Sequence, residues 1–284
     1  MLAPDGRLKG DLTVFNWGDG TWWIMGSYYL REWHMRWFHD HREEGVQVED
    51  ISDSVCGFSI SGPKARALLS RLTHEDVGPT AMPFMGCREM DVGLVRAKVG
   101  RLSVTGELGY EIFCDPLEHL TIYRALKEAG TDLGAVDIGY GALLSLRLEK
   151  SFGIWNAEFM QAYTPGETGM DRWIDWEKPD FLGKQAALAE RDSGPGRRLV
   201  TLEVHANGAD ASGFEPVWRD GARVGYITSG GYGHCVDRSL AMAFVPPDLA
   251  EPGTELTTHI VGAERAAQVI PPSPYDPAGT AMRG

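Results

Sequence analysis

The amino-acid sequence predicts an α+β protein in which a mixed domain, residues 1–190, precedes a small β-barrel domain with a tail, residues 197–284. In the first region, short runs of β-branched and aromatic residues alternate with segments of helical period. In the second, roughly five or six short strand-like runs are separated by turn residues, as is typical of a small barrel. The polar segment 189–198, with Gly-Pro-Gly at its centre, predicts the linker between the two domains.

Composition favours a globular protein that works on small molecules. The chain has 284 residues, 43% of them hydrophobic, which is enough to bury a substantial core. Its formal net charge of -13, with no run of Lys or Arg, argues against binding to nucleic acid or to an anionic membrane. No apolar run is long enough to span a bilayer and no signal-like segment opens the chain, so we expect a cytoplasmic protein.

The cysteines indicate neither a disulfide framework nor a zinc site. None of them forms a CxxC pair, and their wide spacing is typical of buried thiols in a reducing compartment. We therefore predict no metal centre. The four residues are Cys56, Cys87, Cys114 and Cys235.

A hairpin and a helix are the first elements expected along the chain. Residues 1–24 carry strand-like runs on both sides of the turn Gly18-Asp19-Gly20. Residues 28–44 predict an amphipathic core helix whose apolar stripe includes Trp33 and Trp37. The histidines of this segment diverge around the helix axis, which favours structural or solvated roles over metal binding. They are His34, His39 and His41.

Further strands and two more helices are expected in the next part of the chain. Residues 46–60 predict strands, and Gly62-Pro63 opens a helix with an apolar stripe. Asp115 is expected to cap a second helix, which carries Pro116 in its first turn. Three of its residues are expected to face inward: Leu117, Leu120 and Tyr123.

A third helix is expected over residues 137–149. Arg147 and Glu149 stand two residues apart near its end, so they face in different directions and at most one of them points into a shared pocket. We assign Arg147 to that pocket, because a guanidinium binds carbonyl or carboxylate oxygens of a ligand. A structural ion pair with a nearby acid is the alternative.

The stretch RLSVTGELGYE, residues 101–111, is the centre of the chemistry that the sequence predicts. It begins and ends like a strand, and its two glycines permit a bulge or tight bend that brings backbone close to a flat ligand. Glu107 and Glu111 lie beside this bend. From residue type alone they are either solvated glutamates on an edge strand or acids presented to a ligand.

Six blocks in sequence order, this stretch included, resemble the aminomethyltransferase (glycine-cleavage T-protein) superfamily. TGELGYEI resembles its TGE-x-G-(aromatic)-E-I signature, and the other blocks are similar to further motifs of the same family. The similarity is greatest to the folate-binding half of dimethylglycine and sarcosine dehydrogenases. The other blocks start at Met1, Ser145, Tyr163, Asp180 and Gly225, and read ML-x-x-x-G-x-x-x-x-D-x-TV, SLRLEK, YTP-x-ETG, DFLGK and GYITSGGYG.

The resemblance implies a T-protein-like folate-binding domain followed by a C-terminal barrel. The chain begins at the family's ML strand, so we expect the folate domain to be partial, without roughly its usual first third. Three explanations of the absent part are open. A partner polypeptide supplies it, the chain is a fragment of a longer reading frame, or the N-terminus folds differently. A further possibility is a degenerate paralogue without activity.

Residue roles follow from the same resemblance. Asp11 matches the catalytic carboxylate that faces the reactive nitrogens of the folate, and a strand-capping Asp in a turn is the alternative. Glu111 matches the glutamate that binds the pterin, where one carboxylate accepts two parallel N–H donors. Glu107, Tyr110 and Arg147 are expected to complete the cofactor-binding set, although Glu107 is also interpreted as structural.

The sequence therefore predicts a tetrahydrofolate-dependent transferase. It would move an aminomethyl or methyl group from a methylated amine such as dimethylglycine or sarcosine and form methylene-tetrahydrofolate. No GxGxxG fingerprint is present, so oxidation of the amine is expected to need a separate flavoprotein. The alternatives are a folate-dependent S- or O-demethylase and a non-catalytic folate-binding module. The module is disfavoured because residues 150–158 lack the cysteine that such modules carry.

Overall fold

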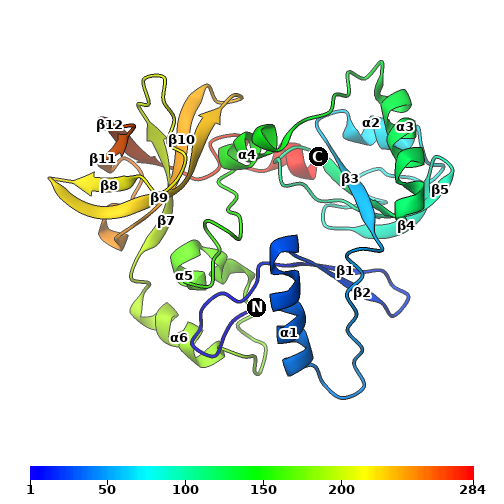
Figure 1. Ribbon diagram of the computed structural model, residues 1–284, viewed down its shortest axis with the longest axis horizontal. Helices are drawn as coiled ribbons and strands as arrows, with labels where there is room; N and C mark the ends of the chain where they lie inside the picture. Colours follow the sequence, from blue (N-terminus) through cyan, green and yellow to red (C-terminus); the bar gives the residue numbers. More distant parts are fainter. The chain divides into compact units, whose positions relative to one another are not determined.

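A computed structural model describes residues 1–284, and the chain divides into two compact units (Figure 1). We call Met1–Asp11 with Tyr140–Pro277 the barrel unit, and Leu12–Gly139 with Ala278–Gly284 the sheet unit. Each unit is thus built from two separate stretches of chain. The polar segment 189–198 lies within the barrel unit.

The helices are short, and none is long and apolar enough to cross a membrane. They are α1 Arg31–His41, α2 Ala65–Ser70, α3 His119–Gly130, α4 Tyr140–Glu149, α5 Pro165–Thr168, α6 Lys184–Ser193 and α7 Thr280–Arg283.

The strands form a two-stranded hairpin, a four-stranded sheet and a closed barrel. The hairpin and the sheet belong to the sheet unit: β1 Thr13–Asn16, β2 Trp22–Met25, β3 Cys56–Ser61, β4 Cys87–Val92, β5 Val95–Gly100 and β6 Gly109–Cys114. The barrel contains β7 Arg198–Val204, β8 Pro216–Arg219, β9 Ala222–Gly233, β10 Arg238–Val245, β11 Glu255–Ile260 and β12 Ala263–Ile270.

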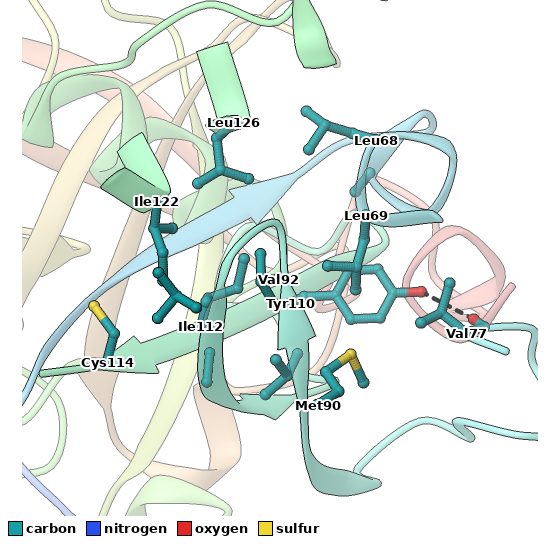
Figure 2. Packing of buried hydrophobic residues seen from close by; sticks show 14 of the residues in the cluster. Leu68, Leu69, Val77, Met90, Val92, Tyr110, Ile112, Cys114, Ile122 and Leu126 are labelled. Atoms are coloured by element: carbon teal, nitrogen blue, oxygen red, sulfur yellow. Dashed lines mark hydrogen bonds between the residues drawn. The ribbon is translucent and has the colours of Figure 1, made fainter. Parts of the chain in front are cut away.

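The four-stranded sheet is antiparallel in the order β3-β6-β5-β4, and α2 and α3 cover one of its faces. Side chains alternate between the faces of a strand, so every second residue of β6 enters the core below these helices. Figure 2 shows this packing, with Tyr110 and Ile112 of β6 among Leu69 of α2 and Ile122 of α3. The burial of these apolar surfaces stabilises the sheet unit.

The other face of the sheet carries the aromatic side chains of the hairpin. The ring of Phe15 contacts the ring of Phe113 at 5.5 Å between centroids, and Trp23 contacts Phe113 at 5.9 Å. The Lys98 ammonium lies 4.8 Å from the ring centre of Trp17. The hairpin prediction is confirmed by the pairing of β1 with β2, and this hairpin covers part of the second face.

Two of the expected elements differ from the structure. Within residues 46–60 only β3 forms; Asp50 instead accepts the backbone N–H of Ser52 at 2.9 Å, a local turn that competes with strand pairing. In α1 the buried residue is His34, whereas Trp33 and Trp37 are only half-buried. The prediction of a Trp-led core stripe was therefore wrong.

The inward face predicted for the helix after Asp115 was also wrong. Asp115 does cap the helix, since its carboxylate accepts the N–H of Leu117 at 2.8 Å. However, the first turn is a 3-10 turn, which has three residues per turn and changes the phase of the stripe. Leu117 is 91% exposed, and Ile122 and Leu126 are buried in place of Leu120 and Tyr123.

The predicted C-terminal barrel is confirmed as a closed barrel in the order β10-β7-β12-β11-β8-β9. Its interior is apolar and includes Leu202 of β7, Ile227 of β9 and Ala241 of β10, all fully buried. The N-terminal segment packs onto the same unit, with Leu2 and Leu8 in a cluster with Ala187 of α6.

Candidate functional site

Glu111 lies at the middle of the four-stranded sheet, on the face opposite to the helices. Its register partners are Ser59 on β3 and Gly100 on β5. Its neighbours in β6, Tyr110 and Ile112, face the helix-covered core, so alternation directs Glu111 to the other face. The carboxylate is thus presented from a paired, central strand rather than from an edge.

The electrostatic setting of Glu111 is that of an acid without a partner. The residue is half-buried, and partial burial raises the pKa of its carboxyl above the ordinary value, because desolvation disfavours the charged form. No hydrogen bond or ion pair to this side chain is present in the structure. Both carboxylate oxygens are therefore available to accept donors from a ligand.

The segment that leads into β6 is held by hydroxyl groups. Thr105 is buried; its hydroxyl contacts that of Ser61 on β3 and lies 2.9 Å from the hydroxyl of Ser103. The backbone N–H of Glu107 donates to the same Thr105 hydroxyl at 3.4 Å. Gly106 adopts a φ of 83°, a left-handed conformation that glycine accommodates best. The glycine prediction for this bend is confirmed.

Arg101, at the start of the same stretch, is a buried anchor. Its side chain is 1% exposed and donates to the carbonyl oxygens of Met82 at 2.7 Å and of Arg283 at 2.6 Å. Burial lowers the pKa of this guanidinium. The contacts attach the C-terminal segment of the chain to the sheet unit.

Tyr110, grouped with the cofactor-binding residues from the sequence, does not share a face with Glu111. Its side chain is fully buried in the core beneath α2, and its hydroxyl donates to the carbonyl oxygen of Val77 at 3.4 Å, as Figure 2 shows. Residues adjacent in a strand point to opposite faces. The structure therefore gives Tyr110 a packing role.

Asp11 lies in the barrel unit, two residues before β1. The residue remains accessible to solvent, yet nearby protein atoms displace enough water to raise the pKa of its carboxyl above the ordinary value. No hydrogen bond to its carboxylate is present. Asp11 thus resembles Glu111 in having free acceptor oxygens and a raised pKa.

Arg147 forms a buried ion pair in the barrel unit. Its side chain is 5% exposed, and Nη1 lies 3.4 Å from Oε2 of Glu158 and 3.0 Å from the carbonyl oxygen of Phe152. Desolvation lowers the pKa of this guanidinium. These contacts correspond to the structural ion pair that was the alternative from the sequence. Glu149 faces elsewhere and accepts the N–H of Cys235 at 2.6 Å, as the two-residue spacing predicted.

Glu158 is the buried acid that sequence reasoning missed. It is completely buried, and besides Arg147 it accepts the N–H of Ile154 at 3.0 Å and the hydroxyls of Thr228 and Ser229 at 2.5 Å each. The available signal was a single acid within the apolar run 152–159. Four donors around one carboxylate allow its burial without loss of hydrogen bonding.

Two hollows in the barrel unit are unrelated to these residues. One, of about 330 Å³, is lined by the ends of β7 and β10 and includes Tyr232 and Asp237. The other, of about 150 Å³, lies beside α6 and is lined by Trp176 and Glu190. Neither is lined by any residue that the sequence singled out for binding.

Comparison with known proteins identifies the family. Residues 1–178 match the family described as GCVT N-terminal domain, and residues 197–276 match the glycine cleavage T-protein C-terminal barrel domain. The structure resembles the glycine cleavage system aminomethyltransferase T from Bartonella henselae, with a TM-score of 0.84 over 98% of this chain and 74% of that one, at 23% identity. That likeness concerns the fold alone.

Curated relatives agree with the family match. Mouse dimethylglycine dehydrogenase is 34% identical over 95% of this chain, and human dimethylglycine dehydrogenase is 32% identical over the same share. The chain spans only 32% of the length of both. The aminomethyltransferase of Bacillus subtilis is 30% identical over 92% of this chain and 72% of its own length. The chain therefore belongs to the glycine cleavage T-protein family, the family of the aminomethyltransferases.

Proposed function

We propose that this chain transfers a one-carbon unit from a methylated amine, such as dimethylglycine or sarcosine, to tetrahydrofolate. Proteins of this family bind tetrahydrofolate. The relatives named dimethylglycine dehydrogenase, which match nearly the whole chain, support a methylated amine as the donor. The observation that carries the proposal is the unpartnered carboxylate of Glu111 at the centre of the sheet.

The environment of Glu111 fits the pterin ring of tetrahydrofolate. The ring offers two parallel donors, a ring N–H and an exocyclic amine, and one carboxylate accepts both in a bidentate, charge-assisted pair. Glu111 has both oxygens free, and its register neighbours, Ser59 and Gly100, are small. Bound tetrahydrofolate supplies the nucleophilic nitrogen that takes up the one-carbon unit. Glu111, which lies on a paired strand, would orient the bound tetrahydrofolate.

We assign the catalytic carboxylate to Asp11. An amine that loses a methylene group passes through a cationic state, and a nearby carboxylate stabilises positive charge and exchanges a proton. The raised pKa of Asp11 brings its proton affinity closer to neutral pH, which favours general acid-base work. Arg147 and Tyr110 have no part in this assignment, because buried contacts within their own units occupy them.

A separate flavoprotein is proposed to oxidise the methylated amine. This chain spans 32% of the length of the dehydrogenase relatives, and it contains no GxGxxG fingerprint. In this arrangement the present chain receives the oxidised one-carbon unit. Residues 1–190 are proposed to hold the folate, followed by the barrel and tail, residues 197–284.

Binding is tested by titrating the chain with 5-formyltetrahydrofolate, following tryptophan fluorescence and heat. Glu111→Gln removes one charged acceptor and is expected to weaken binding about 10- to 150-fold, which corresponds to about 1.5–3 kcal/mol. Glu89→Gln is the matched control, with the same change of charge on β4 of the same sheet. An equal loss in both variants, or no loss in Glu111→Gln, would contradict the assignment of the pterin to Glu111.

Transfer is tested with methyl-labelled dimethylglycine, a dimethylglycine-oxidising flavoenzyme and tetrahydrofolate. We expect labelled methylene-tetrahydrofolate to form faster with the chain than without it. Asp11→Asn should reduce that rate by orders of magnitude and leave binding of 5-formyltetrahydrofolate intact. Unchanged transfer by Asp11→Asn would remove this residue from the mechanism, and labelled methyl-tetrahydrofolate from S- or O-methyl donors would favour the demethylase alternative.

A further inference from the structure

Ser59 is the side chain directly opposite Glu111 on the neighbouring strand. The pairing of β3 with β6 places Ser59 against Glu111 and Ser61 against Gly109. In an antiparallel pair, opposed residues share a face, with Cβ atoms about 4.5–5.5 Å apart. Ser59 is exposed, and no hydrogen bond to its hydroxyl is present in the structure. A free hydroxyl thus lies beside a free carboxylate.

The opposite side of Glu111 is apolar. Its partner on β5 is Gly100, and a Cβ built there would lie 2.5 Å from the ring of Phe15 and 3.0 Å from Leu102. The space beside Gly100 is therefore filled by hydrocarbon. A ligand that is hydrogen-bonded to Glu111 therefore contacts a hydrogen-bonding group on the β3 side and carbon atoms on the β5 side.

This asymmetry matches the edge of a 2-amino-4-oxopyrimidine, the edge of a pterin that lies away from the nitrogen that takes up the one-carbon unit. Along that edge an amine, a ring N–H and a carbonyl oxygen stand in order. A carboxylate accepts from the first two groups and leaves the carbonyl next to it, where an unpaired acceptor would lose free energy on binding. A hydroxyl beside the carboxylate can donate to this carbonyl.

We propose that Ser59 donates a hydrogen bond to the 4-carbonyl oxygen of the pterin held by Glu111. The inference rests on the proposed function and adds a residue that sets the orientation of the ring. With the carbonyl on the β3 side, the ring can bind in only one of its two flipped orientations. Ser59 is therefore a positioning residue for the ring and not a catalytic one.

Ser61 provides a matched control on the same strand and face. Its hydroxyl contacts Thr105, so Ser61→Ala removes a serine hydroxyl without touching the proposed ligand contact. Ser59→Thr keeps a hydroxyl and suits a strand position, because β-branched residues are favoured in strands. It is expected to restore what Ser59→Ala loses.

The experiment measures 5-formyltetrahydrofolate affinity together with the infrared stretching frequency of a 4-¹³C-labelled carbonyl in the bound ligand. Ser59→Ala should weaken binding about 3- to 10-fold, as for loss of one neutral hydrogen bond. The carbonyl frequency should rise, because a donor to that oxygen is lost. Ser59→Thr should restore both values, and Ser61→Ala should leave the carbonyl frequency unchanged.

The outcomes separate this inference from the function on which it rests. Wild-type affinity and an unchanged carbonyl frequency in Ser59→Ala would overturn the role of Ser59 while folate binding stands. The same frequency shift in Ser61→Ala would also overturn it, because a general disturbance of β3 would then be the cause. Absence of binding by the folded wild-type chain would instead refute the proposed function.

Discussion

The buried carboxylate of Glu158 is expected to contribute more to stability than any surface acid of the barrel unit. Glu158→Gln keeps the shape of the side chain but removes its charge. The amide can keep its oxygen toward the donors Ile154 and Arg147 and turn its N–H₂ toward the hydroxyls of Thr228 and Ser229. Arg147 is nevertheless left as a buried cation without a counter-charge. Breaking a buried ion pair from one side typically costs about 3–5 kcal/mol.

The control makes the same substitution in an exposed pair of the same unit. Glu203 lies 3.0 Å from Arg238, and their side chains are 33% and 50% exposed. Surface pairs contribute at most about 1 kcal/mol. With a urea dependence of about 3 kcal/mol per molar, Glu158→Gln should lower the unfolding midpoint by about 1–1.7 M. Glu203→Gln should lower it by less than about 0.3 M.

Urea unfolding followed by circular dichroism checks both values. The two variants share the chemical change, and the control pair is even closer, so the comparison measures the effect of burial together with the additional hydrogen bonds that burial requires. Equal midpoint shifts in the two variants would refute the reasoning. A shift smaller than about 0.3 M in Glu158→Gln would do the same.

Three further predictions concern the sheet unit. Gly57→Ala should lower the melting temperature steeply, because its Cβ would lie 2.0 Å from a carbonyl oxygen of β6, whereas Gly231→Ala in the barrel, with its nearest atom at 3.8 Å, should be tolerated. Burial raises the pKa of Cys114 to about 12, so iodoacetamide at pH 8 should label it far more slowly than the exposed Cys235, as mass spectrometry would reveal. Burial also raises the pKa of Glu111 above 4.5, so just above pH 4.5 the folded state retains a proton that the unfolded chain has released. The free energy of unfolding therefore declines as pH rises from the unfolded pKa through the folded pKa of this carboxyl. The melting temperature of Glu111→Gln minus that of the wild type should therefore increase from pH 4 to pH 7.

Local patterns in the sequence were sufficient for the hairpin and for the barrel strands. The turn at Gly18-Asp19-Gly20 and the alternating runs on either side predicted the β1–β2 hairpin, and the short runs after residue 197 predicted the barrel. These features depend on neighbours in the chain. The face of α3 was missed because its 3-10 start is not visible in residue spacing, so Leu117 was placed inward although it is 91% exposed.

The candidate site was only partly accessible to such reasoning. The sequence singled out Glu111, but it grouped Tyr110 with it, although adjacent strand residues face opposite sides once the covered face is known. Ser59 and Glu158 were missed because their importance depends on register and on packing between distant segments. The separation of Glu111 from Glu158 into different units likewise depends on long-range contacts.

The division of each unit into two stretches of chain has a consequence during synthesis. Residues 12–139, which make up most of the sheet unit, leave the ribosome as one block and can fold early. Met1–Asp11, which precedes this block, must wait until the segment from Tyr140 to Pro277 exists before it can join its own unit. Asp11 thus acquires its folded surroundings only after the whole of the intervening block, residues 12–139, has been made.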